Sequence, residues 1–141
     1  TDIGLIFSSN GAGAGLVVRA AFKAITTPSG NWRVRAKFKV TQNGANTTGV
    51  GLALMNSAEP TKYIQFGWDA RAVMKVNRFT PPVGFVAEQA TPVPYPSIEW
   101  LEIQKIGDNL FFRGSNDGKN FIQLHTESAT AYFAAVPNRV G

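Results

Sequence analysis

The chain has 141 residues, which is room for one domain with a sizeable core, and it is predicted to be a single domain over residues 1–141. Hydrophobic residues make up 44% of it and aromatic residues 11%, which argues against disorder, and no apolar run reaches the roughly 18 residues that a membrane-spanning helix needs. The net charge of +5 favours acidic partners, and the lack of cysteine excludes a disulfide framework and a thiolate metal site.

Short runs rich in β-branched and aromatic residues recur along the chain, separated by clusters of Gly, Pro, Asn and Ser. This spacing is typical of strands joined by tight turns. Helical periodicity is absent, and only residues 127–135 have room for a short helical turn. The chain therefore predicts an all-β fold, an antiparallel sandwich or barrel. The predicted strands cover residues 5–7, 16–25, 32–40, 48–55, 62–68, 71–79, 83–87, 99–106, 109–115 and 120–125.

Residues 32–40 alternate strictly between two kinds of side chain, so a strand here has two different faces. The apolar face consists of Trp32, Val34, Ala36, Phe38 and Val40. The basic stripe on the other face consists of Arg33, Arg35, Lys37 and Lys39. We interpret the stripe as a solvated outer face that discourages edge pairing or, alternatively, as a contact for an acidic polysaccharide, a neighbouring subunit or nucleic acid. Nucleic acid is the least favoured, because the stripe is short and has no interleaved stacking aromatics.

The predicted strands at 62–69 and 99–105 have polar and aromatic side chains out of phase with their apolar residues. These side chains should face away from the core, where aromatic faces and planar hydrogen-bonding groups can hold a sugar ring. They form one candidate ligand-binding patch if the two strands share a sheet, and otherwise they are ordinary sheet surface. The candidate residues are Tyr63, Gln65, Asp69, Trp100, Glu102 and Gln104, with Arg71 beside them.

Residues 80–96 hold five of the eight prolines. Because proline cannot donate a backbone hydrogen bond, we expect a stiff surface excursion rather than a central strand. Such a segment either flanks a binding face or merely connects two strands.

The segment 107–124 has two apolar-rich runs on either side of a polar loop at 115–120. The sequence Asn116-Asp117-Gly118 is typical of a tight hairpin bend, and we expect Phe121 to return to the core beyond it. A calcium site is not expected, because the loop supplies one carboxylate where calcium needs several oxygens.

The chain is not expected to be an enzyme. Glu99 and Glu102 are the closest pair of carboxylates, and three residues apart on a strand they face opposite sides, so they cannot flank one glycosidic bond. His125 is the only histidine, and we expect it to have a packing or surface role on the same face as Phe121 and Gln123. No catalytic residue, metal site or cofactor is predicted.

Residues 100–110 (WLEIQKIGDNL), followed by 115–121 (SNDGKNF), resemble a hairpin pattern that recurs in concanavalin A-like lectin and glucanase sandwiches. That superfamily includes laminin-G-like modules and many bacterial and phage sugar-binding modules. Residues 32–38 and 138–141 are similar to an early strand and a late strand of the same family. The resemblance implies a jelly roll of two antiparallel sheets, one of them concave and often used to hold a glycan. The paired acidic motif of the superfamily's retaining glucanases is missing, so the resemblance does not imply hydrolysis.

We therefore expect a non-catalytic, lectin-like carbohydrate-binding module of a secreted or virion protein, with a glycan or polysaccharide as its partner. The alternative is a structural or adhesion domain, such as a decoration or tail-associated domain of a phage particle, that contacts other virion or cell-surface subunits. Both hypotheses place the chain outside the cell or on a virion surface, without nucleic acid and without membrane insertion. The start at Thr1 and the strand that begins at 138–141 suggest a piece of a longer polypeptide.

Overall fold

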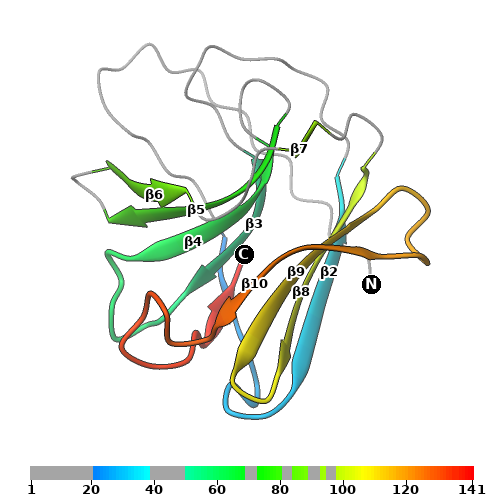
Figure 1. The fold of residues 1–141 in the computed structure, drawn as a ribbon. Helices are drawn as coiled ribbons and strands as arrows, with labels where there is room; N and C mark the ends of the chain where they lie inside the picture. The colour runs from blue at the N-terminus through cyan, green and yellow to red at the C-terminus, as the bar shows by residue number, and fades with distance from the viewer. Residues whose placement is uncertain (1–20, 39–49, 69–72, 81–83, 89–92, 95–97) are drawn as a thin grey trace.

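Two β-sheets pack face to face in this chain (Figure 1). The computed structural model describes residues 21–38, 50–68, 73–80, 84–88, 93–94 and 98–141, and these residues contain no helix. The prediction of an all-β, two-sheet antiparallel sandwich is thus confirmed. The strands are β1 (Lys23–Ala24), β2 (Trp32–Lys37), β3 (Val50–Met55), β4 (Tyr63–Trp68), β5 (Val73–Thr80), β6 (Gly84–Glu88), β7 (Val93–Pro94), β8 (Trp100–Ile106), β9 (Asn109–Ser115), β10 (Ile122–Ser128) and β11 (Arg139–Val140).

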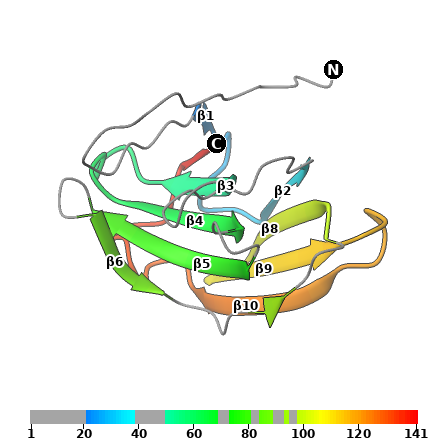
Figure 2. The ribbon, with the colours of Figure 1, turned by 90° about the horizontal axis from the view of Figure 1, so that it is seen from above.

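The larger sheet has the order β1-β11-β3-β4-β5-β6, with β7 also paired to β5. The smaller sheet has the order β10-β9-β8-β2, and all pairings in both sheets are antiparallel. Figure 2 shows the C-terminus, which follows β11, beside β1, and β1 is the edge of the larger sheet opposite β6. Strands distant in the sequence are therefore neighbours in the larger sheet.

Most predicted strands match observed ones within one to three residues at each end. The predicted strand at 5–7 and residues 16–20 lie outside the described residues. The proline-rich segment adds β6 and β7 beside β5, at the edge of the larger sheet, as its proline content predicts. The strand β7 was not predicted, because two residues that include a proline give no alternating pattern. Residues 129–135 form turns and bends rather than a helical turn.

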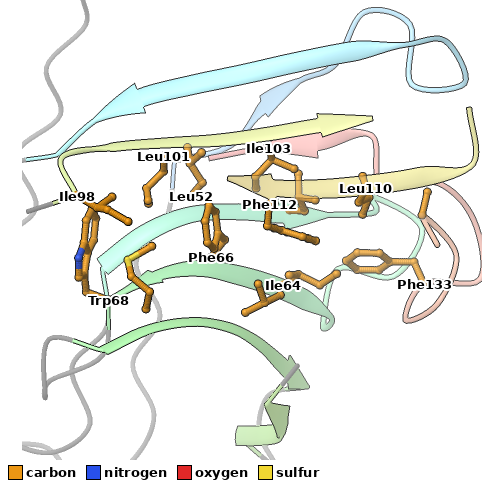
Figure 3. Packing of buried hydrophobic residues seen from close by; sticks show 14 residues of the cluster. Leu52, Ile64, Phe66, Trp68, Ile98, Leu101, Ile103, Leu110, Phe112 and Phe133 are labelled. Carbon is orange, nitrogen blue, oxygen red and sulfur yellow. The ribbon is translucent and has the colours of Figure 1, made fainter. Parts of the chain in front are cut away.

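The core lies between the two sheets and is built mainly from alternate residues of β3, β4, β5, β8 and β9 (Figure 3). Phe66 of β4 meets Phe112 of β9 edge to face, with ring centroids 5.4 Å apart and an interplanar angle of 71°. Full burial of one such side chain contributes about 1.5–3 kcal/mol. The predicted apolar face of β2 packs against this core through Trp32, Val34 and Ala36, and Phe38 just beyond the strand does the same.

One inward position of the smaller sheet holds a lysine. Lys105 follows the buried Leu101 and Ile103 in the alternation of β8, and it is only 2% exposed. Its Nζ donates hydrogen bonds to the backbone oxygens of Ser29 at 2.9 Å, Gly30 at 3.2 Å and Gly107 at 2.6 Å. The ammonium group thereby joins the turn before β2 to the β8–β9 hairpin.

We predict that Lys105→Met lowers the free energy of unfolding by about 2 kcal/mol, because three backbone oxygens lose a charged donor in a buried position. Urea denaturation of the parent and the variant measures this. Lys37→Met is the matched control, since the Lys37 side chain is 57% exposed and should change stability little. Equal effects of the two substitutions would contradict the role of Lys105.

Candidate functional site

The structure divides the predicted ligand patch between two surfaces. Strand β4 belongs to the larger sheet and β8 to the smaller one. Because Ile64 and Ile103 both point into the core, the alternate residues of β4 and β8 point away from it on opposite sides of the sandwich. The prediction of a single patch is therefore wrong. Asp69, Arg71 and Lys39 lie outside the described residues.

The outer face of the larger sheet brings Tyr63 and Gln65 together with residues of β5. The register pairs Tyr63 with Phe79 and Gln65 with Asn77. The rings of Tyr63 and Phe79 are stacked, with centroids 4.8 Å apart and an interplanar angle of 8°. We name this surface the Tyr63 face, and it consists of Tyr63, Gln65, Lys75, Asn77 and Phe79.

Polar groups of the Tyr63 face are buried although they point away from the core. Tyr63 and Asn77 are each 8% exposed, and Lys75 is 9% exposed. Within the part of the chain that the structure describes, the Tyr63 hydroxyl and Asn77 Oδ1 have no hydrogen-bond partner. Buried polar atoms nearly always have a partner, so these two atoms require an explanation.

Burial also disfavours ionisation of the Tyr63 hydroxyl. It raises the pKa of this hydroxyl far above the ordinary value of 10.0, and the nearby Tyr132 adds to the shift. A tyrosine hydroxyl is neutral at pH 7 even at its ordinary pKa, and in this neutral form it can both donate and accept a hydrogen bond.

Strand β3 places small residues beside Gln65 and Gly67, and Met55 opposite Tyr63. Gly51 of β3 is paired with Gly67 of β4, and Ala53 is paired with Gln65. A Cβ added at Gly51 would lie 2.1 Å from the Phe66 backbone oxygen, so the close approach of the two strands requires glycine. Next to Gln65, β3 contributes nothing larger than a methyl group.

The outer face of the smaller sheet contains the other predicted residues. We name it the arginine face, and it consists of Arg33, Arg35, Lys37, Trp100, Glu102, Gln104, Phe111 and Arg113. The basic stripe lies on this outer face, as its alternation predicts for the three described members.

Glu102 is the buried centre of the arginine face, at 1% exposure. Arg35 Nε bonds its Oε2 atom, and Arg113 Nη1 lies 3.1 Å from its Oε1 atom. Arg33 Nε lies 3.7 Å from Oε2. Arg113 also donates to the side-chain oxygen of Gln104. Glu102 and Gln104 thus bind arginine side chains of the same chain. Their oxygen atoms, which were predicted to recognise sugar hydroxyls, are already hydrogen-bonded to those arginines.

The Trp100 side chain is also covered by another segment of the chain, the hairpin turn after β9. The hairpin turn after β9 approaches it so closely that a Cβ on Gly118 would lie 2.8 Å from the indole Cε2 atom. Lys37 Nζ lies 5.9 Å from the ring centroid. The predicted sugar platform therefore packs against Gly118.

The loop at 115–120 is the bend of a hairpin, as predicted. Gly118 has a φ of +72°, which favours glycine. Asp117 Oδ1 accepts hydrogen bonds from the backbone N–H groups of Lys119 and Asn120, both at 2.8 Å, and from Ser115 Oγ at 2.8 Å. The carboxylate thus serves the turn itself.

Two predictions about β10 and the residue before it are wrong. Phe121 does not return to the core, because the Gly118 turn rises onto the arginine face, where the Arg35 guanidinium lies 4.2 Å above the Phe121 ring. His125 does not share a face with Gln123, because a β-bulge lies between them. The His125 ring instead contacts the core residue Phe112, with centroids 5.6 Å apart.

Sequence reasoning missed the contribution of β5 to the Tyr63 face. The signal was present, because Met74 and Val76 are the apolar phase of that strand and leave Lys75, Asn77 and Phe79 on the other side. The sequence analysis also did not place Arg113 on the arginine face. Its position was predictable, because Arg113 directly follows the buried Phe112 in β9 and must therefore point outward.

Among the described residues, no group of three or more His, Cys, Asp or Glu side chains is placed to hold a metal ion. In that same part of the chain, no helix is long and apolar enough to span a membrane. Comparison of the chain with protein-family models, with curated proteins and with solved structures found no match.

We predict that Asp117→Asn lowers the stability of the domain at pH 7 and that the difference from the parent narrows as the pH falls below about 4. Hydrogen bonds from the Asn120 and Lys119 backbones, then from Ser115 and the Asn120 side chain, hold the pKa of Asp117 well below its ordinary range. A carboxylate with a depressed pKa stabilises the fold above the pKa of the unfolded chain, and this contribution is lost as the pH falls toward the folded pKa.

Urea midpoints measured from pH 7 to pH 2 test this expectation. Asp108→Asn, in the β8–β9 turn, is the control for the change in net charge. A difference between the parent and Asp117→Asn that stays constant over the whole range would show that the Asp117 charge has no part in the turn.

Proposed function

We propose that the chain is a non-catalytic carbohydrate-binding module that holds its glycan on the Tyr63 face. The observation that supports this most directly is a pair of buried atoms, the Tyr63 hydroxyl and Asn77 Oδ1, that have no hydrogen-bond partner among the described residues. Sugar hydroxyls both donate and accept hydrogen bonds, so a bound glycan would satisfy both atoms.

The composition of the Tyr63 face supports the same proposal. The stacked rings of Tyr63 and Phe79 offer aromatic area, and the paired amides of Gln65 and Asn77 offer planar donors and acceptors. Beside Gln65, β3 contributes only the methyl group of Ala53. Aromatic area combined with a few fixed polar groups is typical of small-molecule sites.

The resemblance to concanavalin A-like sandwiches agrees with this proposal, because one sheet of that fold often holds a glycan. The described residues add no argument for hydrolysis, since the carboxylate of Glu102 is already bound by arginines on the other side of the sandwich. In this proposal the module belongs to a secreted or virion protein and acts outside the cell or on a virion surface.

We predict that Tyr63→Phe weakens glycan binding about tenfold while leaving the domain at least as stable as the parent. The substitution removes one hydroxyl that has no described partner, so folding loses no hydrogen bond and the buried site loses a polar atom. A glycan array identifies a ligand for the parent, titration with that ligand gives the affinities, and urea denaturation gives the stabilities.

Tyr132→Phe is the matched control, because the Tyr132 hydroxyl donates to the Phe79 backbone oxygen at 2.8 Å and also bonds Thr80 Oγ1. This variant should lose about 1 kcal/mol of stability. An array without any bound glycan would contradict the proposal. So would a loss of stability in Tyr63→Phe equal to that in Tyr132→Phe, because the Tyr63 hydroxyl would then have a partner within the chain.

A further inference from the structure

The arginine face has more positive charge than its own carboxylates neutralise. Three guanidinium groups, those of Arg33, Arg35 and Arg113, surround the single carboxylate of Glu102. Lys37 is matched separately by Glu99 at 3.1 Å. Counting only these described side chains, two positive charges remain around Glu102.

The structure holds two of these guanidinium groups in fixed positions. Arg35 bonds Glu102 and lies 4.2 Å above the Phe121 ring, and Arg113 lies 5.2 Å from the centroid of Phe111. Guanidinium groups that are already stacked and hydrogen-bonded lose less conformational freedom when a ligand binds. Arg33 completes the set, since its side chain is 52% exposed and its Nε atom lies 3.7 Å from Glu102 Oε2.

The ligand that fits this surface is a hydrated polyanion rather than an apolar protein surface. The rings of Phe111 and Phe121 face Arg113 and Arg35 of the same chain. Among the described residues, the exposed large hydrophobics are Val50, Ile106 and Ile122, and none lies in the middle of the arginine face. The centre of a protein interface is enriched in arginine and aromatic residues but otherwise depleted of charge, whereas the excess positive charge of this face pairs well with carboxylates.

We propose that the arginine face is a second binding surface, separate from the Tyr63 face, for an acidic polysaccharide whose sugars bear carboxylates. Arg33, Arg35 and Arg113 bind the carboxylates of the polysaccharide, and Glu102 holds the arginines in place. This inference does not depend on the proposed function, because the two faces lie on opposite sides of the sandwich.

The test is titration of the domain with polygalacturonate, a polymer of carboxylated sugars, at low and at physiological salt. We expect binding that weakens with added salt, since charges are screened over about 8 Å at physiological salt but over about 30 Å at 0.01 M. Arg33→Gln should weaken it about tenfold, because a charge-assisted hydrogen bond is lost. Lys23→Gln, which removes an exposed cation from β1 of the larger sheet, is the matched control and should have little effect.

Three further measurements distinguish a carboxylated polysaccharide from the Tyr63 site, from an acidic protein and from a nucleic acid. Tyr63→Phe should bind polygalacturonate as the parent does, so failure of the Tyr63 site leaves this result intact. Poly-glutamate and a single-stranded oligothymidylate represent an acidic protein and a nucleic acid, and we expect both to bind at least tenfold more weakly than polygalacturonate. Equal or tighter binding of either one would overturn the proposal. No binding of polygalacturonate, or equal losses in Arg33→Gln and Lys23→Gln, would overturn it as well.

Discussion

The packing of one sheet against the other is the constraint on which every other feature depends. Phe66 and Phe112 meet between the sheets, and the alternation of each strand then determines which side chains point outward. A sandwich has two outward faces that cannot meet. Two chemically different surfaces result, one with buried polar and aromatic groups and one with arginines around a carboxylate.

The sequence predicted what depends on neighbouring residues and missed what depends on distant ones. The inward sets of β2, β4 and β8 followed from alternation alone, because residues two apart share a face whatever strand lies next to them. The sheet to which β4 or β8 belongs depends on pairing between distant strands, which a local pattern does not contain, and the single ligand patch failed for that reason. The β-bulge at 123–125 likewise depends on the pairing of β10 with β9, and it turns His125 to the inner side of the sheet, opposite to the side that strict alternation from Gln123 predicts.

The positions that break the alternating pattern are informative. Lys105 is a cation at an inward position, and its hydrogen bonds to three backbone oxygens compensate for its burial. Glu102 is a buried carboxylate at an outward position, and its hydrogen bonds from Arg35 and Arg113 compensate for its burial. The Tyr63 hydroxyl and Asn77 Oδ1 have no such explanation within the described residues. Positions where local rules fail without compensation are where binding sites are expected.

The place of β11 in the larger sheet has a consequence for how this chain is made. Among the described strands, β11 lies between β1 and β3, so in that set β1 joins the sheet only through a segment that the ribosome delivers last. Until then the growing polypeptide presents one edge of β3 without its neighbour among the described strands, and an open strand edge is a surface on which nascent chains associate wrongly. Slow translation near residue 139 would lengthen that vulnerable interval, and a chaperone that covers extended backbone would shorten it.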